Sequence, residues 1–360
     1  MTKVMIFINH SLALYKFRKE LVVELRKKGY KVFVCYPNDE KDDYFESLGC
    51  AVIHFKMDRK STNVFEEISA ISRFKKICKR IKPDILLIYT LKCCLYSSFV
   101  SKKIKKIATV TGQSPFFKHS SGLKKIIYNL IVKRFSKFNY VFFQNRDDFS
   151  FFDKTIKRKK NFILVAGSGV NTTEHPYQGP VVSNPFTFSF VGRLVKEKGI
   201  YEFLSCIRKI NDKNVVFNIA GPCEDPQVLD FIKDMRDSRI NVLGDVEDIN
   251  SLYKKSTCIV LPSYSEGMSN ALLEAHSSGR PIICSNIPGC SEIIIPGITG
   301  LLVEPKDKDS LLNAMNVLLR KKECDLTEMG LNGRKYVVDS FSRDSVIKEY
   351  IEVVDVLAQK

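Results

Sequence analysis

The residues of this 360-residue chain best suited to chemistry are two glutamates, Glu266 and Glu274, on either side of a turn. Between them, Gly267-Met268-Ser269 leads from the apolar run Cys258–Pro262 into a helical run, Asn270 to Ser278. A buried strand that feeds a helix N-terminus predicts an anion site, because unpaired backbone N–H groups and the helix dipole face the ligand. Carboxylates flanking such a site suit a ligand that carries both a diphosphate and hydroxyl groups, as a sugar nucleotide does. The alternative is that the acids only stabilise the start of the helix, by about 1 kcal/mol at most.

Two cations follow an earlier strand-like run, Phe186–Val191. Arg193 and Lys198 come after its last residue, and ligands of open α/β sheets bind at the carboxyl ends of strands. Two positive charges there could neutralise the charge that builds on a departing diphosphate. The alternative is a surface ion pair with Glu197 or Glu202.

Size and composition favour a two-domain globular protein. The chain is 44% hydrophobic, long enough for two cores, and has no uninterrupted apolar run of the roughly 18 residues that a membrane span needs. Its eleven cysteines are scattered without a CxxC pair, which predicts reduced thiols in a cytoplasmic protein. We expect neither a metal site nor a cofactor, and Asp307-Lys308-Asp309 is predicted to cap a helix.

The excess of positive over negative charge is confined to the first half of the chain. The net charge is +17, yet residues 1–170 hold 35 Lys and Arg against 14 Asp and Glu, whereas the remainder holds 22 against 26. Such an asymmetry predicts an anionic partner for the first half: nucleic acid, acidic lipid or a phosphorylated acceptor. A merely solvated lysine-rich surface is the alternative.

Strand-like and helix-like runs alternate along both halves. Near-continuous apolar strands separated by helices indicate parallel sheets covered on both faces. The predicted fold class is α/β, with two doubly wound Rossmann-like domains facing across a cleft. The predicted domains are residues 1–172 and 185–341, joined through a proline-rich linker at 171–185, with a C-terminal helix at 342–360 that packs back on the first domain.

Four segments of the second half resemble one enzyme family in sequence and order. They are GRLxxxKG (Gly192–Gly199), SEGMSNALLEA (Ser265–Ala275), GRPII (Gly279–Ile283) and PGITGLLVEPKD (Pro296–Asp307). The chain thereby resembles glycosyltransferase family 4, whose members have the GT-B fold, need no metal and retain the configuration of the transferred sugar.

The resemblance implies a role for each matching residue. It implies that Arg193 and Lys198 bind the donor diphosphate, together with Gly192 and the amides of Gly267, Met268 and Ser269. It implies that Glu274 binds the ribose hydroxyls and that Glu266 binds the hydroxyls of the transferred sugar. The implied catalytic set is Arg193, Lys198 and Glu266.

The first half matches less closely, with segments similar to those of polysaccharide and O-antigen members. They are Tyr89-Thr90-Leu91-Lys92, Tyr96-Ser97-Ser98, Thr109-Val110-Thr111-Gly112, Phe142–Asp148 and Gly167–Val170. The acceptor-side candidates are Ser11, Lys92, Thr111 and Gly112. Cys93 replaces the proline of the first segment, and Asn9-His10-Ser11-Leu12 replaces the usual glycine pair. His10 and His119 match no motif, so no catalytic base is assigned.

A basic amphipathic run, Gly122–Phe138, has two interpretations. Its apolar residues recur at helical spacing beside five Lys and Arg residues. It could be a core helix whose lysines are exposed to solvent, or an interfacial helix that docks on anionic lipid. Lys157–Lys160 would add to the field of such a helix.

These observations predict a hexosyltransferase. We expect it to move a hexose from a nucleotide sugar, with UDP as the expected nucleotide, to a lipid-diphosphate-linked saccharide in surface polysaccharide (capsule or O-antigen) biosynthesis. We expect it in the cytoplasm, peripherally associated with the anionic inner face of the membrane, without nucleic acid as a partner. The alternatives are a nucleotide-sugar epimerase or a glycogen-synthase-like enzyme of the same fold, a basic nucleic-acid-binding protein, and an inactive homologue kept as an assembly partner.

Overall fold

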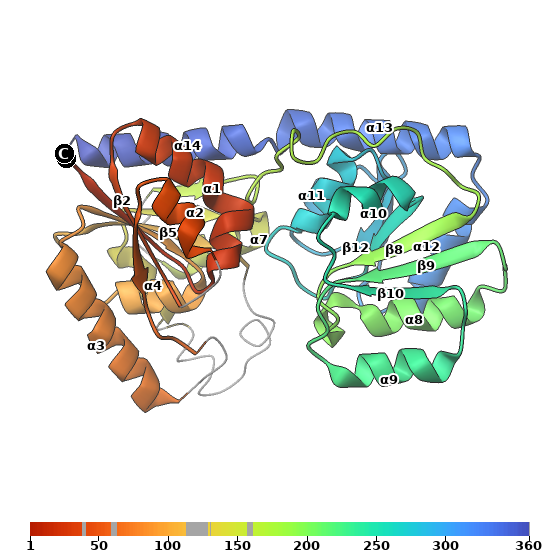
Figure 1. Ribbon diagram of the computed structural model, residues 1–360, viewed down its shortest axis with the longest axis horizontal. Coiled ribbons are helices and arrows are strands. Elements are labelled where there is room, and N and C mark those ends of the chain that lie inside the picture. The colour runs from red at the N-terminus through yellow and green to blue at the C-terminus, as the bar shows by residue number, and fades with distance from the viewer. Residues whose placement is uncertain (38–40, 59–62, 113–128, 130, 157–160, 360) are drawn as a thin grey trace. The chain divides into compact units, whose positions relative to one another are not determined.

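A computed structural model describes residues 1–37, 41–58, 63–112, 129, 131–156 and 161–359 (Figure 1). The chain forms two compact units: Met1–Ser168 with Asp344–Lys360, and Gly169–Arg343. Each unit is built on one sheet whose strands are all parallel.

The first unit contains a seven-stranded sheet in the order β3-β2-β1-β4-β5-β6-β7. Its strands are β1 (Lys3–Phe7), β2 (Lys31–Tyr36), β3 (Ala51–His54), β4 (Ile85–Tyr89), β5 (Lys105–Val110), β6 (Tyr140–Phe143) and β7 (Phe162–Leu164). Its helices are α1 (Ser11–Lys27), α2 (Asp42–Ser47), α3 (Val64–Ile81), α4 (Leu91–Ser97), α7 (Arg146–Thr155) and α14 (Arg343–Ala358), with a 3-10 turn, η1 (Arg134–Lys137).

Both faces of this sheet are covered by apolar helix faces, as Figure 1 shows. On one face α1 and α14 pack over strand residues such as Ile6 and Leu87. On the other face Phe74 of α3 and Phe152 of α7 pack over residues such as Phe7. The prediction that the C-terminal helix returns to the first unit is confirmed, since α14 contributes Val346, Tyr350 and Val354 to this core.

The second unit contains a six-stranded sheet in the order β10-β9-β8-β11-β12-β13. Its strands are β8 (Phe186–Val191), β9 (Val215–Ala220), β10 (Ile240–Gly244), β11 (Cys258–Leu261), β12 (Ile282–Ser285) and β13 (Gly300–Val303). Its helices are α8 (Ile200–Lys209), α9 (Pro226–Met235), α10 (Ile249–Lys255), α11 (Asn270–Ser277), α12 (Lys308–Leu319) and α13 (Glu323–Ser340), with 3-10 turns η2 (Lys196–Lys198) and η3 (Ser291–Ile293).

Helix starts in this unit follow the capping chemistry that the sequence offers. Asp225 accepts a hydrogen bond from the amide of Gln227 ahead of α9, which has Pro226 at its first turn. Asp307 accepts hydrogen bonds from the amides of Asp309 and Ser310, so the predicted cap at Asp307-Lys308-Asp309 is confirmed. These side chains supply acceptors that the first turn of a helix lacks.

The segment 171–185 differs from the predicted linker, because it packs on the second unit. The carbonyl oxygens of Gly179 and Pro180 accept hydrogen bonds from the buried guanidinium of Arg280, at 2.9 and 3.2 Å. The amide of Gln178 donates to the carbonyl of Ser278. Prolines and turn residues in this stretch thus reflect an irregular but anchored path rather than an exposed connection.

Candidate active site

The predicted donor residues lie at the carboxyl edge of the second sheet, where its strand order reverses. The chain runs from β8 outward to β10 on one side and then from β11 to β13 on the other, so the switch point falls between β8 and β11. Arg193 and Lys198 follow β8, while Glu266 follows β11. Crevices at such switch points are where open α/β sheets bind ligands.

The structure brings Lys198 and Glu266 into direct contact. The ammonium of Lys198 lies 2.5 Å from Oε1 of Glu266, and the hydroxyl of Ser263 donates to the same oxygen at 2.8 Å. The two charged side chains are only 19% and 10% exposed. Low exposure strengthens the attraction between the charges, so the pair holds both groups in place.

A close approach of two loops sets this contact. Gly199 has φ +75°, and a β-carbon on it would lie 2.1 Å from the carbonyl oxygen of Pro262. The amide of Tyr264 donates to the carbonyl of Glu197 at 2.8 Å. Only glycine fits such a position without strain, so Gly199 lets the loop after β8 lie against the end of β11.

The loop after β12 closes on the turn before α11. Gly289 has φ +79°, and a β-carbon on it would lie 2.4 Å from the carbonyl oxygen of Gly267. The amide of Ser269 donates to the carbonyl of Gly289 at 2.9 Å. This bond engages the Ser269 amide within the protein, so in this structure the amide is not open to a phosphate oxygen. Met268, within this turn, is buried, with 8% of its surface exposed.

Arg193 lies nearer solvent and pairs with an acid that the sequence did not suggest. Its guanidinium is 3.1 Å from Oε1 of Glu224, and its side chain is 51% exposed. The surface-pair alternative named Glu197 or Glu202, yet Glu202 instead accepts a hydrogen bond from the hydroxyl of Tyr264 at 2.6 Å. The backbone explains the choice, because Leu194 donates to the carbonyl of Pro222 and so brings the loop after β9 beside Gly192 and Arg193.

Glu274 on α11 is positioned by two residues that sequence reasoning missed. Its Oε2 accepts a hydrogen bond from the hydroxyl of Tyr253 at 3.1 Å, and its Oε1 lies 3.9 Å from Nε2 of His175. His175 is 8% exposed, and its Nδ1 lies 3.1 Å from Oδ1 of Asn250. Burial, followed by the Glu274 charge, raises the pKa of Tyr253, so the tyrosine stays a hydrogen-bond donor. No spacing rule links His175 or Tyr253 to Glu274, since they come from the anchored segment and from α10.

The acceptor-side candidates lie at the corresponding edge of the first unit. That sheet switches direction between β1 and β4. Ser11 begins α1 after β1, and Lys92 follows β4, while Thr111 and Gly112 follow β5.

Three residues of this edge stand out: Thr90, Lys92 and Ser11. Thr90, between β4 and Lys92, has φ +73°, a conformation that is strained for a β-branched residue and that clusters at functional sites. Lys92 is held by Glu67, 2.7 Å away, and by the carbonyl of Asp58. Because Glu67 belongs to α3 and Lys92 to α4, this ion pair holds α3 against α4. The buried hydroxyl of Ser11 has no hydrogen-bond partner among the described residues.

The first part of the basic run Gly122–Phe138 (residues 122–128, and residue 130) lies outside the described residues, as do His119 and Lys157–Lys160. Its last part is described, and there Val132, Phe135 and Phe138 are buried in the first unit. This end of the run therefore has the core character that the first interpretation predicts. Among the residues that the structure describes, no helix is long and apolar enough to cross a membrane.

Solved structures with the same fold are glycosyltransferases of the GT-B class. Sucrose-phosphate synthase from Thermosynechococcus elongatus superposes with a TM-score of 0.80 at 16% identity over the whole of both chains. Anabaena Alr3699/HepE in complex with UDP and glucose superposes with a TM-score of 0.79 at 14% identity, covering 99% of this chain and all of that one. The fold of the two units is therefore the GT-B fold.

Sequence comparisons identify the family. The family model "Glycosyl transferases group 1" matches residues 185–321, and the model "Glycosyl transferase 4-like" matches residues 3–145. The chain therefore belongs to glycosyltransferase family 4 and is a glycosyltransferase.

Its relatives include bacterial glycosyltransferases, one named for capsular polysaccharide biosynthesis and two for undecaprenol-diphosphate-linked saccharides. The N,N'-diacetylbacillosaminyl-diphospho-undecaprenol alpha-1,3-N-acetylgalactosaminyltransferase of Campylobacter jejuni is 24% identical over 97% of both chains. The capsular polysaccharide biosynthesis glycosyltransferase CapM of Staphylococcus aureus is 24% identical over 90% of both. The UDP-Gal:alpha-D-GlcNAc-diphosphoundecaprenol alpha-1,3-galactosyltransferase of Escherichia coli is 35% identical over 48% of this chain and 46% of its own.

Proposed function

We propose that this glycosyltransferase moves a hexose from a UDP-sugar to a saccharide carried on a lipid diphosphate, in the assembly of a surface polysaccharide. Two of the relatives described above are named for acceptors of this kind, and one of them is named for a UDP-sugar donor. The observation that carries the proposal is the contact between Lys198 and Glu266 at the switch point of the second sheet.

The donor binds between the loops that follow β8 and β11. The ammonium of Lys198 and the guanidinium of Arg193 bind its diphosphate. The diphosphate lies next to the amides of Gly267 and Met268 and the N-terminal end of α11. The carboxylate of Glu266 accepts hydrogen bonds from hydroxyls of the transferred sugar, and that of Glu274 accepts them from hydroxyls of the ribose. Since Glu266 already accepts from Lys198, one carboxylate can orient the sugar and the phosphate-binding cation together.

Bond cleavage then depends on stabilising the leaving group. As the bond between the anomeric carbon and the diphosphate oxygen breaks, negative charge grows on that oxygen, and Lys198 and Arg193 offset it. An acceptor hydroxyl forms the new bond on the same face, so the configuration is retained. Its proton passes to the departing phosphate oxygen, which balances the reaction without a protein base.

The basic first half of the chain supplies the acceptor side. Ser11, Thr111 and Gly112 lie at the carboxyl edge of the first sheet and are proposed to contact the acceptor saccharide. A lipid-linked acceptor also calls for peripheral attachment to an anionic membrane, which the lysine-rich composition of this half supports.

Donor binding and transfer test the proposal directly. UDP-sugars and GDP-sugars are compared for the rise in melting temperature that a bound ligand produces. Labelled sugar is then followed from the best donor to undecaprenyl-diphosphate-linked saccharides. Conversion of the free donor to another sugar nucleotide, with no transfer to any lipid-linked saccharide, would establish the epimerase alternative instead.

A further inference from the structure

A large pocket lies at the opposite edge of the first sheet from the acceptor-side candidates. It is lined by residues immediately ahead of β1, β4 and β5, which are Thr2, Asp84 and Ile104, and by the last turns of α3 and α14. Its volume is about 1170 Å³. Substrates of doubly wound sheets bind at the carboxyl edge, so this amino-edge pocket is separate from the proposed acceptor site.

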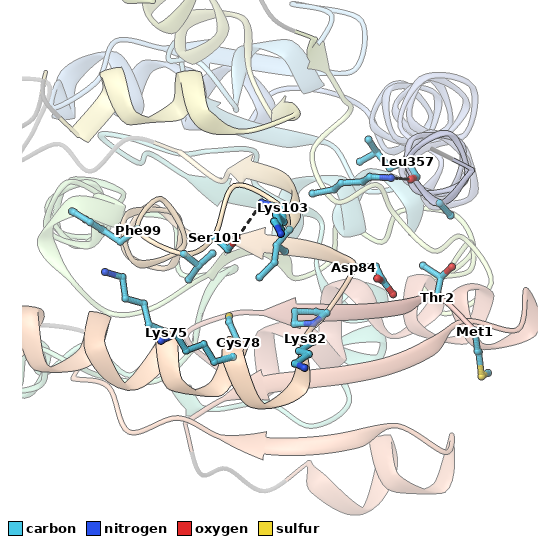
Figure 2. A pocket seen from close by; sticks show the side chains of 16 residues that line it. Met1, Thr2, Lys75, Cys78, Lys82, Asp84, Phe99, Ser101, Lys103 and Leu357 are labelled. Carbon is cyan, nitrogen blue, oxygen red and sulfur yellow. Dashed lines mark hydrogen bonds between the residues drawn. The ribbon is translucent and has the colours of Figure 1, made fainter.

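The pocket is strongly basic. Five lysines line it: Lys75, Lys79, Lys82, Lys103 and Lys105. Figure 2 shows Lys75 of α3 and Lys82, the residue after α3, on one side and Lys103, from the segment ahead of β5, on the other. The one acid in the lining, Asp84, accepts a hydrogen bond from the backbone amide of Lys3 at 2.8 Å.

A helix end accounts for one of the five pocket lysines, Lys105, and for Lys3, which does not line the pocket. The Lys105 ammonium donates to the carbonyl of Leu357 near the end of α14, and the Lys3 ammonium donates to the carbonyl of Ile81 at the end of α3. Cations favour helix C-termini, so such contacts are expected. Within the described part of the chain, Lys75, Lys79 and Lys103 form no ion pair. The pocket lining thus holds five lysines against one carboxylate, that of Asp84.

More cations gather behind the aromatic wall of the pocket. The guanidinium of Arg134 lies 3.9 Å from the centre of the Phe99 ring, and the ammonium of Lys75 lies 5.9 Å from it. Partial burial, then the charges of Arg134 and Lys102, lower the pKa of Lys137. Like charges held this close repel one another, and a bound anion would relieve that repulsion.

We propose that this pocket binds a phosphate-bearing anion with at least two negative charges. Lys75, Lys79 and Lys103 provide charge-assisted hydrogen bonds to the phosphate oxygens, as lysine ammonium groups do in other phosphate sites. Phe99, Ile104 and Leu357 provide an apolar wall for the rest of the molecule. The anion is either a soluble polyphosphate or the headgroup of an anionic phospholipid, and the site does not depend on the proposed transfer reaction.

The test compares two charge-neutralising variants of the same helix. Lys75→Gln with Lys79→Gln removes two pocket cations, whereas Lys76→Gln with Arg80→Gln removes two exposed cations of α3 that do not line the pocket. Both are made in full-length protein that also carries Arg193→Ala and Lys198→Ala, so that the donor site contributes no phosphate binding. Tripolyphosphate is titrated into each by calorimetry. Binding should weaken at least about tenfold in the pocket variant and stay within about twofold of the parent in the control.

Vesicles then separate the two sources of the phosphate. Flotation with phosphatidylglycerol vesicles, against phosphatidylcholine vesicles, is measured for the same proteins. A loss of flotation in the pocket variant that the control does not show identifies a lipid headgroup, whereas equal flotation with weaker tripolyphosphate binding identifies a soluble anion. Equal tripolyphosphate affinity in the pocket and control variants overturns the proposal, whatever the vesicles show.

Discussion

At the residue scale, the contact between Lys198 and Glu266 explains how the site can be assembled before a donor arrives. Both side chains are mostly shielded from water, so each would be costly to leave alone. In the free protein the carboxylate of Glu266 pairs with the ammonium of Lys198 and also accepts a hydrogen bond from the hydroxyl of Ser263. A diphosphate that enters beside them gains a cation already in position, which limits the reorganisation that binding requires.

Replacing Lys198 tests this arrangement. Lys198→Ala should lower kcat by about 10²–10³-fold, since one group that stabilises developing charge is lost. It should also abolish the rise in melting temperature with UDP-sugar. Lys196→Ala is the matched control, because Lys196 is exposed in the same 3-10 turn. Normal transfer by Lys198→Ala would show that the diphosphate binds elsewhere.

His175 offers a test of the ribose side. His175→Ala should raise the KM for the donor about tenfold and change kcat much less, since the residue orients Glu274 rather than meeting the reacting atoms. His175→Gln keeps a polar group near Asn250 and should recover part of the loss. Steady-state kinetics with varied donor measure both, and an equal fall in kcat for His175→Ala would contradict a positioning role.

A buried lysine in the first unit predicts a pH dependence of stability. Burial lowers the pKa of the Lys106 amine to about 8 from its usual 10.5, and the side chain is 2% exposed. Between these values the unfolded chain binds more protons than the folded chain, so the contribution of this group to stability rises with pH across that window. Below pH 8 the group opposes folding.

Lys106→Met should therefore remove that rise. Urea unfolding at about pH 7.5 and about pH 9.5 should show a smaller difference in Lys106→Met than in the parent. Lys102→Met, at an exposed position, should keep the difference of the parent. An unchanged difference in Lys106→Met would show that the amine is not what titrates.

What the sequence revealed of the site follows from how each residue is held. The strand, turn and helix around Glu266 could be predicted, because their signals lie within a short stretch of chain. Glu224, Tyr253 and His175 could not be predicted, since each reaches its partner across more than 20 residues of chain through tertiary packing. The Ser269 amide was expected to bind phosphate, but its bond to Gly289 depends on how two loops fold together.

At the scale of elements, close backbone contacts join the loops at neighbouring strand ends, in addition to the side-chain contact between Lys198 and Glu266. Gly199 against Pro262 and Gly289 against Gly267 join the loops after β8, β11 and β12. A side chain at either glycine would push these loops apart. The donor site is thus rigid where the phosphate is proposed to bind.

Gly199→Ala measures this close approach. The substitution adds the strain of a positive φ to a clash with the Pro262 carbonyl, so we expect a loss of about 2–4 kcal/mol in the free energy of unfolding and a large loss of transfer activity. Gly244→Ala is the control, because Gly244 has φ +64° and open space around its β-carbon position. It should lose about 1 kcal/mol, the conformational part alone. Equal losses in the two variants would mean that the loops tolerate separation.

Strands and long helices were predictable because their apolar periodicity is local. The predicted run Phe186–Val191 coincides with β8, and the run Cys258–Pro262 differs from β11 by one residue. Short or polar elements escaped prediction: β7 has three residues at the sheet edge, and α13 has a weak apolar pattern and packs against α11. Tertiary contacts, not propensity, decide such elements.

At the scale of the whole molecule, α14 completes the core of the first unit. Tyr350 is 1% exposed, stacks on Phe142 with ring centres 4.2 Å apart, and shares a 2.8 Å hydrogen bond with the hydroxyl of Thr109. Tyr350→Ala should lower the stability of the first unit by about 3–5 kcal/mol.

Calorimetry can separate this effect from events in the second unit. UDP-sugar should still stabilise the second unit in Tyr350→Ala, because every proposed donor contact lies in residues 169–343. A uniform loss of both unfolding transitions and of donor binding would show that the units fold as one.

The path of the chain also bears on its biosynthesis. The first unit is made of the two ends of the sequence, with residues 169–343 inserted between them. While the ribosome is still adding the last residues, Leu14, Leu21 and Leu25 of α1 lack the helix that will shield part of their face of the core. The second unit can therefore fold before the first unit is complete. Until α14 has been synthesised, the first unit exposes apolar surface that chaperones can bind.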